Sequence, residues 1–299
     1  MSPRTIIVTG AAGFLGSHTV EALLRQGHAV RGLDLPQARW QDYLGTVLGH
    51  PALTSDRRDL LDVPADDPVF AGADAVIHCA GLADHAPSMT DPELYMRVNV
   101  LGTVRILEAA RAHAIGRVVN LSSAAVYGIA SAPTAESHPI NPLNPYALTK
   151  WMGEEACEAW SRLYGVSTVS FRVFNCYGPR AQTGGILVAL MGRRRAGLPL
   201  MLTGTGDQQR DFVFATDAAE ALALGALTPG AAGAYNLGSG RPETIRRVAE
   251  LMGGPIEYGP ARPNELPIIL ADISRARRDL GWEPTTGLED GIARLLAGG

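Results

Sequence analysis

The chain has 299 residues, 46% of them hydrophobic and 19% charged, which is typical of a globular enzyme of one or two domains. This composition excludes a disordered or collagen-like chain. The formal net charge is only −4, and we expect the one basic cluster, residues 193–195, to lie on a solvated helix face, so neither feature favours a nucleic-acid partner.

Short strands and amphipathic helices alternate along the first half of the chain. Apolar, often β-branched runs predict buried strands at 5–9, 28–33, around Leu53, 74–79 and 117–122. Helices are expected at about 14–26 and from an N-cap at Asp91, followed by Pro92, to just before Gly116. This alternation predicts right-handed βαβ units and therefore an α/β fold with a Rossmann-type doubly wound parallel sheet.

The second half begins with a further helix and strand and then becomes less regular. The helix is expected from Asn144 and Pro145 to about Leu163, and the strand from Val166 to Val173. After residue 175 glycine and proline are frequent, and the predicted strands are short, at 200–202, 211–214 and 235–237. We therefore predict a second, smaller C-terminal α/β domain. The sheet domain is assigned residues 1–174 plus about 211–238, and the smaller domain residues 175–210 plus about 239–299.

Two of the predicted helices, at about 91–113 and 145–163, carry apolar residues on two faces. Helices of this kind are usually buried on two sides, and only one side can face the sheet. We therefore expect a homodimer formed through these two helices.

The sequence gives no sign of a membrane segment, a secretory signal or a metal site. No apolar run approaches the roughly 20 residues of a membrane span, and a strand begins directly after the first residues. Cys79, Cys157 and Cys176 lie far apart and lack metal-ligand spacing. Unpaired cysteines suit a reducing compartment, so we expect a cytoplasmic protein.

A glycine-rich turn joins the first predicted strand to the first helix. Its glycines are Gly10, Gly13 and Gly16, with Phe14 and Leu15 between the last two. They allow a tight turn, a close approach of the backbone to a pyrophosphate, and close packing of helix on strand. The helix N-terminus then offers free N–H groups and the positive end of its dipole to phosphates. The turn therefore predicts a bound dinucleotide.

The acidic residue at the end of the second strand, Asp34, indicates which dinucleotide binds. A carboxylate at this place accepts hydrogen bonds from both ribose hydroxyls and repels a 2′-phosphate, so we predict NAD rather than NADP. Arg31 and Arg39 leave the alternative open, since a nearby arginine could compensate for a phosphate. Asp59 and Leu60, after the third strand, are expected near the adenine.

Reactive side chains stand where a strand ends and a helix begins. Tyr146 and Lys150 are four residues apart and therefore share one helix face. We expect the Lys150 ammonium and a bound nicotinamide cation to lower the pKa of Tyr146, making it a base for a sugar hydroxyl. Ser122 and Ser123 end the fifth strand, at the carboxyl edge where open α/β sheets bind ligands. Because they point to opposite sides of a strand, only one is expected to orient the reacting oxygen.

Taken together, these motifs resemble the extended short-chain dehydrogenase/reductase family of sugar-nucleotide epimerases and dehydratases. The chain is similar in particular to the UDP-glucose (UDP-galactose) 4-epimerases of that family. The resemblance extends over nearly the whole chain and rests on the following ordered segments: Gly10–Gly16, His78–Gly81, Asn99, Leu121–Gly128, Tyr146–Lys150, Phe171–Pro179, Arg210–Val213 and Arg262–Glu265.

The resemblance implies a cofactor, a substrate class and a role for each matching residue. Tyr146 would be the acid/base, Lys150 its partner and Ser123 the catalytic serine beside Ser122. The cofactor would be NAD and the partner a nucleoside-diphosphate sugar, most of all a UDP-sugar. Further implied contacts are Ala80 and Asn99 to the cofactor, Ser122 and Asn175 to the nucleotide sugar, and Arg210 and Arg262 to its diphosphate.

The chain departs from the family at positions that bear on the reaction. Dehydratases carry an Asp-Glu pair just after the catalytic hydroxyl residue, where this chain has Ala124 and Ala125. A lysine found in some epimerases is replaced by Ala83, with Asp84 and His85 beside it. Because the acids of a dehydratase are missing, we predict epimerisation of the sugar at C4 through a 4-keto intermediate, as the resemblance to the 4-epimerases implies. A 4-keto-sugar-nucleotide reductase or sugar dehydrogenase is the alternative, ahead of a 4,6-dehydratase and a non-catalytic dinucleotide sensor.

Overall fold

A parallel seven-stranded sheet forms the centre of the larger part of the molecule. The computed structural model describes residues 2–182, 185–262 and 265–297. The sheet has the order β10-β6-β5-β4-β1-β2-β3, and every neighbouring pair is parallel. Its strands are β1 (Thr5–Thr9), β2 (Ala29–Leu33), β3 (Leu53–Asp56), β4 (Ala75–His78), β5 (Arg117–Ser123), β6 (Thr168–Val173) and β10 (Gly233–Leu237). The predicted Rossmann-type α/β fold is confirmed.

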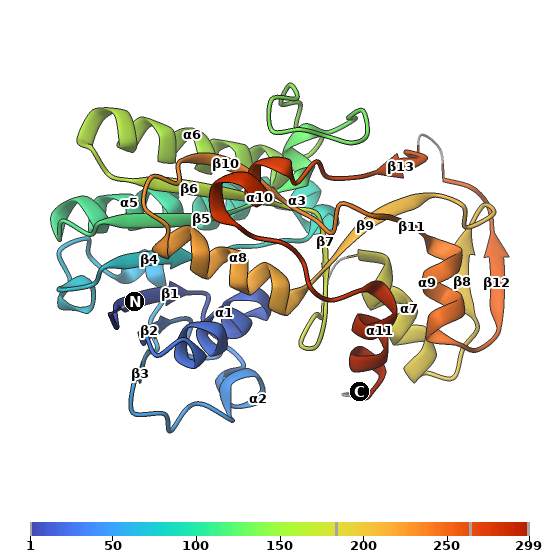
Figure 1. Ribbon diagram of the computed structural model, residues 1–299, viewed down its shortest axis with the longest axis horizontal. Helices are drawn as coiled ribbons and strands as arrows, with labels where there is room; N and C mark the ends of the chain where they lie inside the picture. Colours follow the sequence, from blue (N-terminus) through green and yellow to red (C-terminus); the bar gives the residue numbers. More distant parts are fainter. Residues whose placement is uncertain (1, 183–184, 263–264, 298–299) are drawn as a thin grey trace.

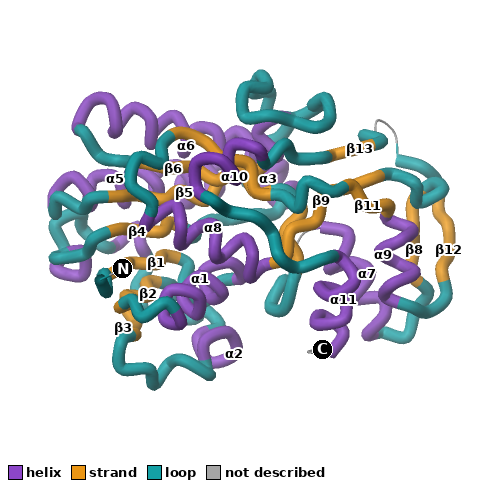
Figure 2. The backbone as a smooth tube through the Cα atoms, in the orientation of Figure 1, coloured by secondary structure: helices purple, strands orange, loops and turns teal. Residues whose placement is uncertain are grey.

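Helices cover both faces of this sheet, as Figures 1 and 2 show. On one face α1 (Phe14–Arg25) packs against α8 (Ala215–Leu227), and on the other α5 (Gly102–Ala112) packs against α6 (Pro145–Tyr164). Each face has its own apolar core, because strands buried on both sides present apolar residues in both directions. The late helix α10 (Ser274–Leu280) also contacts α8 and β10.

The predicted helix caps are present, but the long helix after residue 91 is not regular. Asp91 accepts a hydrogen bond from the Leu94 N–H, and Asn144 accepts one from the Ala147 N–H. Instead of one α-helix over 91–113, the structure has α4 (Pro92–Tyr95), a π-helical segment over Met96–Leu101, and then α5. A π-helical turn often marks a functional site, and this one contains Asn99.

The smaller part of the molecule is built around short strands at the carboxyl end of the main sheet. Strands β7 (Asn175–Tyr177), β9 (Gln209–Phe214), β11 (Pro242–Thr244) and β13 (Ile268–Ile269) form one sheet, and β8 (Leu200–Thr203) pairs with β12 (Ile256–Gly259). Helices α7 (Gly185–Arg195), α9 (Ile245–Met252) and α11 (Leu288–Ala297) cover them around a third apolar core. Strands β8 and β9 match the short strands predicted at 200–202 and 211–214, whereas the strand predicted at 235–237 is β10 of the main sheet. Helices α2 (Trp40–Leu44) and α3 (His85–Thr90) were not predicted, nor were the helices that follow α6. The domain boundaries stay a prediction.

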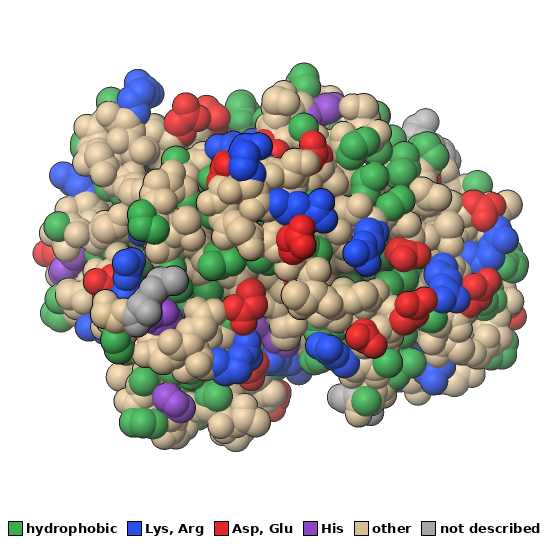
Figure 3. All heavy atoms as spheres, viewed as in Figure 1, with side chains coloured by type: hydrophobic (Ala, Val, Ile, Leu, Met, Phe, Trp, Pro, Cys, Tyr) green, Lys and Arg blue, Asp and Glu red, His purple; other side chains and the backbone are tan. Residues whose placement is uncertain are grey.

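The surface carries charges of both signs. On the face seen in Figure 3, basic and acidic side chains are interspersed rather than gathered by sign. The cluster at 193–195 ends α7, where Arg193 donates to the Pro199 carbonyl and Arg194 to the Gly253 carbonyl. Within the described part of the chain, none of the helices combines the length and apolar character that crossing a bilayer requires.

Candidate active site

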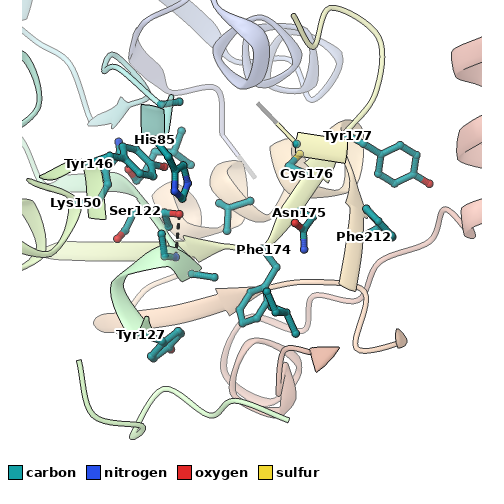
Figure 4. A pocket seen from close by; sticks show the side chains of 18 of the residues that line it. His85, Ser122, Tyr127, Tyr146, Lys150, Phe174, Asn175, Cys176, Tyr177 and Phe212 are labelled. Carbon is teal, nitrogen blue, oxygen red and sulfur yellow. Dashed lines mark hydrogen bonds between the residues drawn. The ribbon is translucent and has the colours of Figure 1, made fainter. Parts of the chain in front are cut away.

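A cavity of about 500 Å³ lies where the carboxyl ends of the main-sheet strands meet the smaller sheet. Ligands of open α/β folds bind at this edge, because the loops after the parallel strands converge there. Its lining includes Ser123 from the larger part. Tyr146 and Lys150, also from the larger part, and Asn175 and Phe212 from the smaller part line it too and are labelled in Figure 4. None of the described residues that line it is an aspartate, a glutamate or an arginine.

The glycine turn allows three backbone segments to meet more closely than side chains would permit. Gly10 has φ +64°, and a Cβ there would lie 2.7 Å from the Ala80 nitrogen. A Cβ at Gly16 would overlap the Gly10 carbonyl oxygen, which itself accepts from the Gly13 N–H at 2.9 Å. Helix α1 has no side-chain cap and no acidic residue in its first turn, so its N-terminus suits an anion. This is a cradle that a Cβ would fill, and it fits a pyrophosphate.

Asp34 lies directly beside this turn, as the sequence predicted. Its carboxylate accepts from the Ala12 N–H at 2.9 Å and from the Leu35 N–H at 2.8 Å, and burial raises its pKa. The two nearby arginines bind elsewhere: Arg31 donates to the carbonyls of residues 69 and 71, and Arg39 lies 3.8 Å from Asp42. The site therefore presents a carboxylate, not a guanidinium, at the place expected for the ribose.

The remaining predicted cofactor residues are each held by local contacts. Phe14 and Leu15 begin α1 and line the cavity. Asp59 accepts from the Leu61 N–H and so caps the short helix that contains buried Leu60. The Ala80 N–H donates to the Thr9 hydroxyl at 3.3 Å.

Asn99, in the π-helical segment, holds the loop after β4 in place. Its amide oxygen accepts from the Leu82 N–H at 2.8 Å, and its nitrogen donates to the Leu82 carbonyl and to the Thr149 hydroxyl. With only 3% of its surface exposed, Asn99 directs its polar atoms to the protein itself. The π-helical turn thereby connects the β4 loop to α6.

Tyr146 and Lys150 lie one turn apart on α6, as expected, and burial shifts the pKa of both. The ammonium of Lys150 donates to the Leu121 carbonyl at 2.9 Å, and burial lowers its pKa to about 8. Burial raises the pKa of Tyr146, against the opposing effect of a hydrogen bond with Ser123. Among the protein groups around Tyr146, desolvation of the phenol thus outweighs the effects that lower its pKa, and the lowering by Lys150 together with a bound nicotinamide stays a prediction.

The two serines at the end of β5 point to opposite sides. Ser123 faces the Tyr146 phenol and accepts from the Ala125 N–H at 3.2 Å. Ser122 donates to the carboxylate of Glu154, which is buried on α6. The hydroxyl that reaches the phenol is thus that of Ser123.

A buried ion pair behind the serines was not found from the sequence. Glu154 and Arg172 are 2.7 Å apart, with 9% and 8% of their side chains exposed. Arg172 also donates to the Tyr127 hydroxyl at 2.9 Å and lies over its ring. Burial alone would lower the pKa of Arg172, but its bonds to Glu154 raise it above the ordinary value. The pair connects α6 to β6 and supports the end of β5 through Ser122.

Of the residues predicted to bind the nucleotide sugar and its diphosphate, Asn175 lines the cavity, whereas Arg210 and Arg262 are not among the described residues that line it. Asn175 donates to the Asp211 carbonyl at 3.0 Å. Arg210 pairs with Glu265 at 3.1 Å and donates to the Leu266 carbonyl, and burial lowers its pKa. Arg262 is exposed. The segment Arg262–Glu265 contains residues 263–264, which lie outside the described residues.

His85 is a further cavity residue, and the sequence singled it out only as a departure from the family. It follows β4, starts α3 and lies beside Tyr146, with ring centroids 5.0 Å apart (Figure 4). Asn144, the N-cap of α6, donates to its Nδ1 at 3.1 Å. Only the docking of α3 on α6 brings the two rings together, so no local signal predicts the contact.

Comparisons with known proteins agree with this geometry. The sequence model of the NAD dependent epimerase/dehydratase family matches residues 6–238. The chain is 33% identical to the UDP-glucose 4-epimerase of Mycolicibacterium smegmatis, over 97% of this chain and 96% of that protein. Among solved structures it is similar to the UDP-N-acetylglucosamine 4-epimerase of Methanobrevibacter ruminantium (TM-score 0.91, 27% identity, 99% of each chain). It is also similar to the UDP-glucuronic acid 4-epimerase of Bacillus cereus in complex with UDP-glucuronic acid and NAD (TM-score 0.90, 27% identity, 98% of each chain).

Proposed function

This chain belongs to the NAD-dependent epimerase/dehydratase family, and from that premise we propose that it epimerises a UDP-sugar at C4 through a transient 4-keto sugar. The observation that carries the proposal is the meeting of Ser123, Tyr146 and Lys150 in one cavity beside the glycine turn. The 4-epimerases named above support it, since they share the whole length of the chain.

The cofactor proposed for the glycine turn is NAD, which supplies a reversible acceptor for two electrons when it is bound. The N-terminus of α1 would hold its pyrophosphate, and Asp34 its adenine ribose. The engagement of Arg31 with the 69–71 turn supports NAD over NADP. The other cofactor contacts that we propose are Phe14, Leu15, Asp59, Leu60, Ala80, Asn99, Tyr146 and Lys150.

Proton movement is assigned to Tyr146. Its phenol oxygen takes the proton of the sugar hydroxyl and returns it, while the Ser123 hydroxyl hydrogen-bonds the reacting oxygen. Burial favours the protonated phenol, so a positive charge is needed to make it a base. Lys150 provides such a charge one helical turn away and is cationic below a pH of about 8.

Epimerisation is favoured over dehydration by what the cavity offers. Removing water from C5–C6 of a sugar requires an acid and a base besides the tyrosine. Ala124 and Ala125 stand where dehydratases carry acids, and the described lining contains no carboxylate. The reductase or dehydrogenase alternative uses the same residues, and net consumption of NAD(H) separates it from an epimerase, which regenerates its cofactor in each cycle.

The nucleotide part of the substrate is proposed to bind the smaller sheet. Asn175 would hydrogen-bond the nucleotide sugar, and Arg210 and Arg262 would bind its diphosphate, since guanidinium groups meet phosphate oxygens in a planar fork. Arg210 would exchange its contact with Glu265 for the diphosphate. Holding the nucleotide at a distance lets the sugar rotate between its two orientations. Ser122, whose hydroxyl bonds Glu154, is assigned a supporting place beside the sugar.

The test is the replacement Tyr146→Phe. The purified protein is assayed with NAD and UDP-glucose, UDP-N-acetylglucosamine or UDP-glucuronic acid, and C4 epimers are separated chromatographically. The wild type should convert at least one of them without net formation of NADH. Tyr146→Phe should lower turnover by roughly 10²- to 10⁴-fold while still binding NAD. Undiminished turnover in that variant would end the assignment.

We also propose a cytoplasmic homodimer formed through the helices at about 91–113 and 145–163. The dimer is supported by exposed apolar side chains on or directly next to these helices, namely Leu101, Leu163 and Tyr164. The cytoplasm is supported by the three cysteines, which are free thiols. Light scattering that returned the mass of a monomer would contradict the dimer.

A further inference from the structure

His85 occupies a place in the cavity where a side chain can touch the reacting end of the sugar. It lines the cavity, is exposed, and lies beside the proposed acid/base Tyr146 with a ring angle of 43°. Lys150 is the other nitrogen base among the described lining side chains, and it donates to the Leu121 carbonyl. Among the described residues that line the cavity, His85 is the one histidine.

The hydrogen bonds around His85 determine which of its ring nitrogens carries the proton. The amide oxygen of Asn144 accepts from the Ala147 N–H at 2.9 Å, and this cap fixes the orientation of the amide. The amide nitrogen, which can only donate, therefore faces His85 Nδ1 at 3.1 Å. In the neutral imidazole Nδ1 is then the acceptor, so Nε2 carries the hydrogen.

Neutral imidazole is the form that the surroundings favour. Desolvation lowers the pKa of His85 below its ordinary value of 6.5, with the nearby charge of Asp84 acting in the opposite direction. The other groups packed around the ring are the phenol of Tyr146 and the amide of Asn144. At neutral pH His85 thus presents one N–H donor with a fixed tautomer.

We propose that His85 Nε2–H donates a hydrogen bond to a sugar oxygen next to the reacting hydroxyl, on C3 or on C6, and so orients the sugar against Tyr146. This inference rests on the proposed function and adds a substrate contact to it. An oxygen on either carbon lies beside the one that Tyr146 serves, which matches the side-by-side placement of the two rings. A hydroxyl accepts this bond, and the fixed tautomer costs nothing to arrange when the sugar binds.

The test combines two substitutions with substrates that lack one hydroxyl. His85→Phe keeps an aromatic ring against Tyr146 and removes the donor, whereas His85→Gln restores an amide N–H near the place of Nε2. His50→Phe, at an exposed histidine, is the matched control. The wild type and each variant are assayed with UDP-glucose and its 2-deoxy, 3-deoxy and 6-deoxy forms, or with the same forms of whichever UDP-sugar the wild type converts. NAD affinity is measured alongside.

The expected result is that kcat/KM falls when the N–H donor at position 85 is removed and recovers when a donor is restored. His85→Phe should lower kcat/KM by roughly 10- to 100-fold, because a sugar hydroxyl in the cavity loses its hydrogen-bond partner. His85→Gln should recover most of it, and His50→Phe and NAD affinity should be unchanged. In the wild type one of the 3-deoxy and 6-deoxy substrates should show the same loss, and His85→Phe should lose nothing further on that substrate. The 2-deoxy substrate should lose equally in both proteins.

Other outcomes separate this inference from the function on which it rests. A wild type active as an epimerase, together with His85→Phe at full kcat/KM, would overturn the His85 contact alone. The contact would also be overturned if His85→Phe and His85→Gln lowered kcat/KM equally and if the loss caused by each deoxy substrate simply added to the loss caused by the substitution. His85 would then be a packing residue. A fall in NAD affinity in His85→Phe would place the imidazole against the cofactor instead. A wild type that converts no UDP-sugar would remove the proposed function and this contact with it.

Discussion

The substitution Glu154→Gln tests whether the buried ion pair supports the active site. Glu154 accepts from Arg172 through three hydrogen bonds, two at 3.1 Å and one at 2.7 Å, and also from Ser122. Glutamine keeps the shape of the side chain but turns one acceptor into a donor that faces N–H and O–H groups. Arg172 then remains a buried cation that has lost its one salt-bridge partner among the described residues.

The expected loss of stability is about 3–5 kcal/mol, which is the usual cost of removing one partner of a buried ion pair. This is a large part of the roughly 5–15 kcal/mol that stabilises a folded domain. Urea unfolding measures it, with the transition midpoint falling at an unchanged m-value. The matched control is Glu289→Gln, which breaks an ion pair with Arg247 whose side chains are 69% and 45% exposed, and it should cost about 0–1 kcal/mol.

A second comparison separates the charge from the shape. Replacing both partners, as Glu154→Leu with Arg172→Met, removes both buried charges and should regain most of the lost stability. The double variant should still be a poor enzyme, since Ser122 loses its acceptor and the adjacent Ser123 loses its support. If Glu154→Gln were as stable as Glu289→Gln, the reasoning that this pair stabilises the end of β5 would be refuted.

Two further predictions concern the cofactor turn and the pH dependence. Gly16→Ala should weaken NAD binding at least about tenfold and cost roughly 1–3 kcal/mol of stability, because the new Cβ overlaps backbone atoms of Gly10. A fluorescence titration with NAD checks this, and Gly49→Ala, where a Cβ meets open space, should bind NAD normally. Turnover should fall as pH rises through about 8, because Lys150 then loses its proton and no longer favours the Tyr146 phenolate. The free energy of unfolding changes in the opposite direction: between pH about 8 and the ordinary lysine pKa this group adds stability, because the unfolded chain there binds more protons than the folded one. Lys150→Arg stays charged and should remove this alkaline fall, so an unchanged profile in that variant would contradict the assignment.

The parts of the fold that the sequence predicted are those encoded by neighbouring residues. The strands are apolar runs, and their alternation with helices specifies a parallel sheet. The caps at Asp91 and Asn144 are recognisable because a side chain and the N–H that it accepts from lie three residues apart. The glycine turn is recognisable for the same reason, since its close contacts arise within one strand–turn–helix unit.

What the sequence could not predict depends on contacts between distant segments. The π-helical turn holds Asn99 against Leu82 and Thr149, which are 17 and 50 residues away. The partner of Arg210 is Glu265, 55 residues further along the chain. Such pairings are chosen when α6 and the late loops dock, and no residue spacing along the chain records that choice.

The acidity of Tyr146 illustrates how the same arrangement can have opposite electrostatic effects. A four-residue step on a helix puts Lys150 one turn from Tyr146 on α6, where both line the cavity, and a nearby cation by itself lowers a tyrosine pKa. The folding that brings both groups to the cavity also removes water from them, which raises the pKa of Tyr146 and lowers that of Lys150 to about 8. Position can therefore be inferred from spacing, whereas protonation cannot, because it depends on the balance between desolvation and charge. In this protein the hydrogen bond with Ser123 opposes the effect of desolvation on the pKa of Tyr146, which supports the proposal that this serine takes part in the acid/base chemistry.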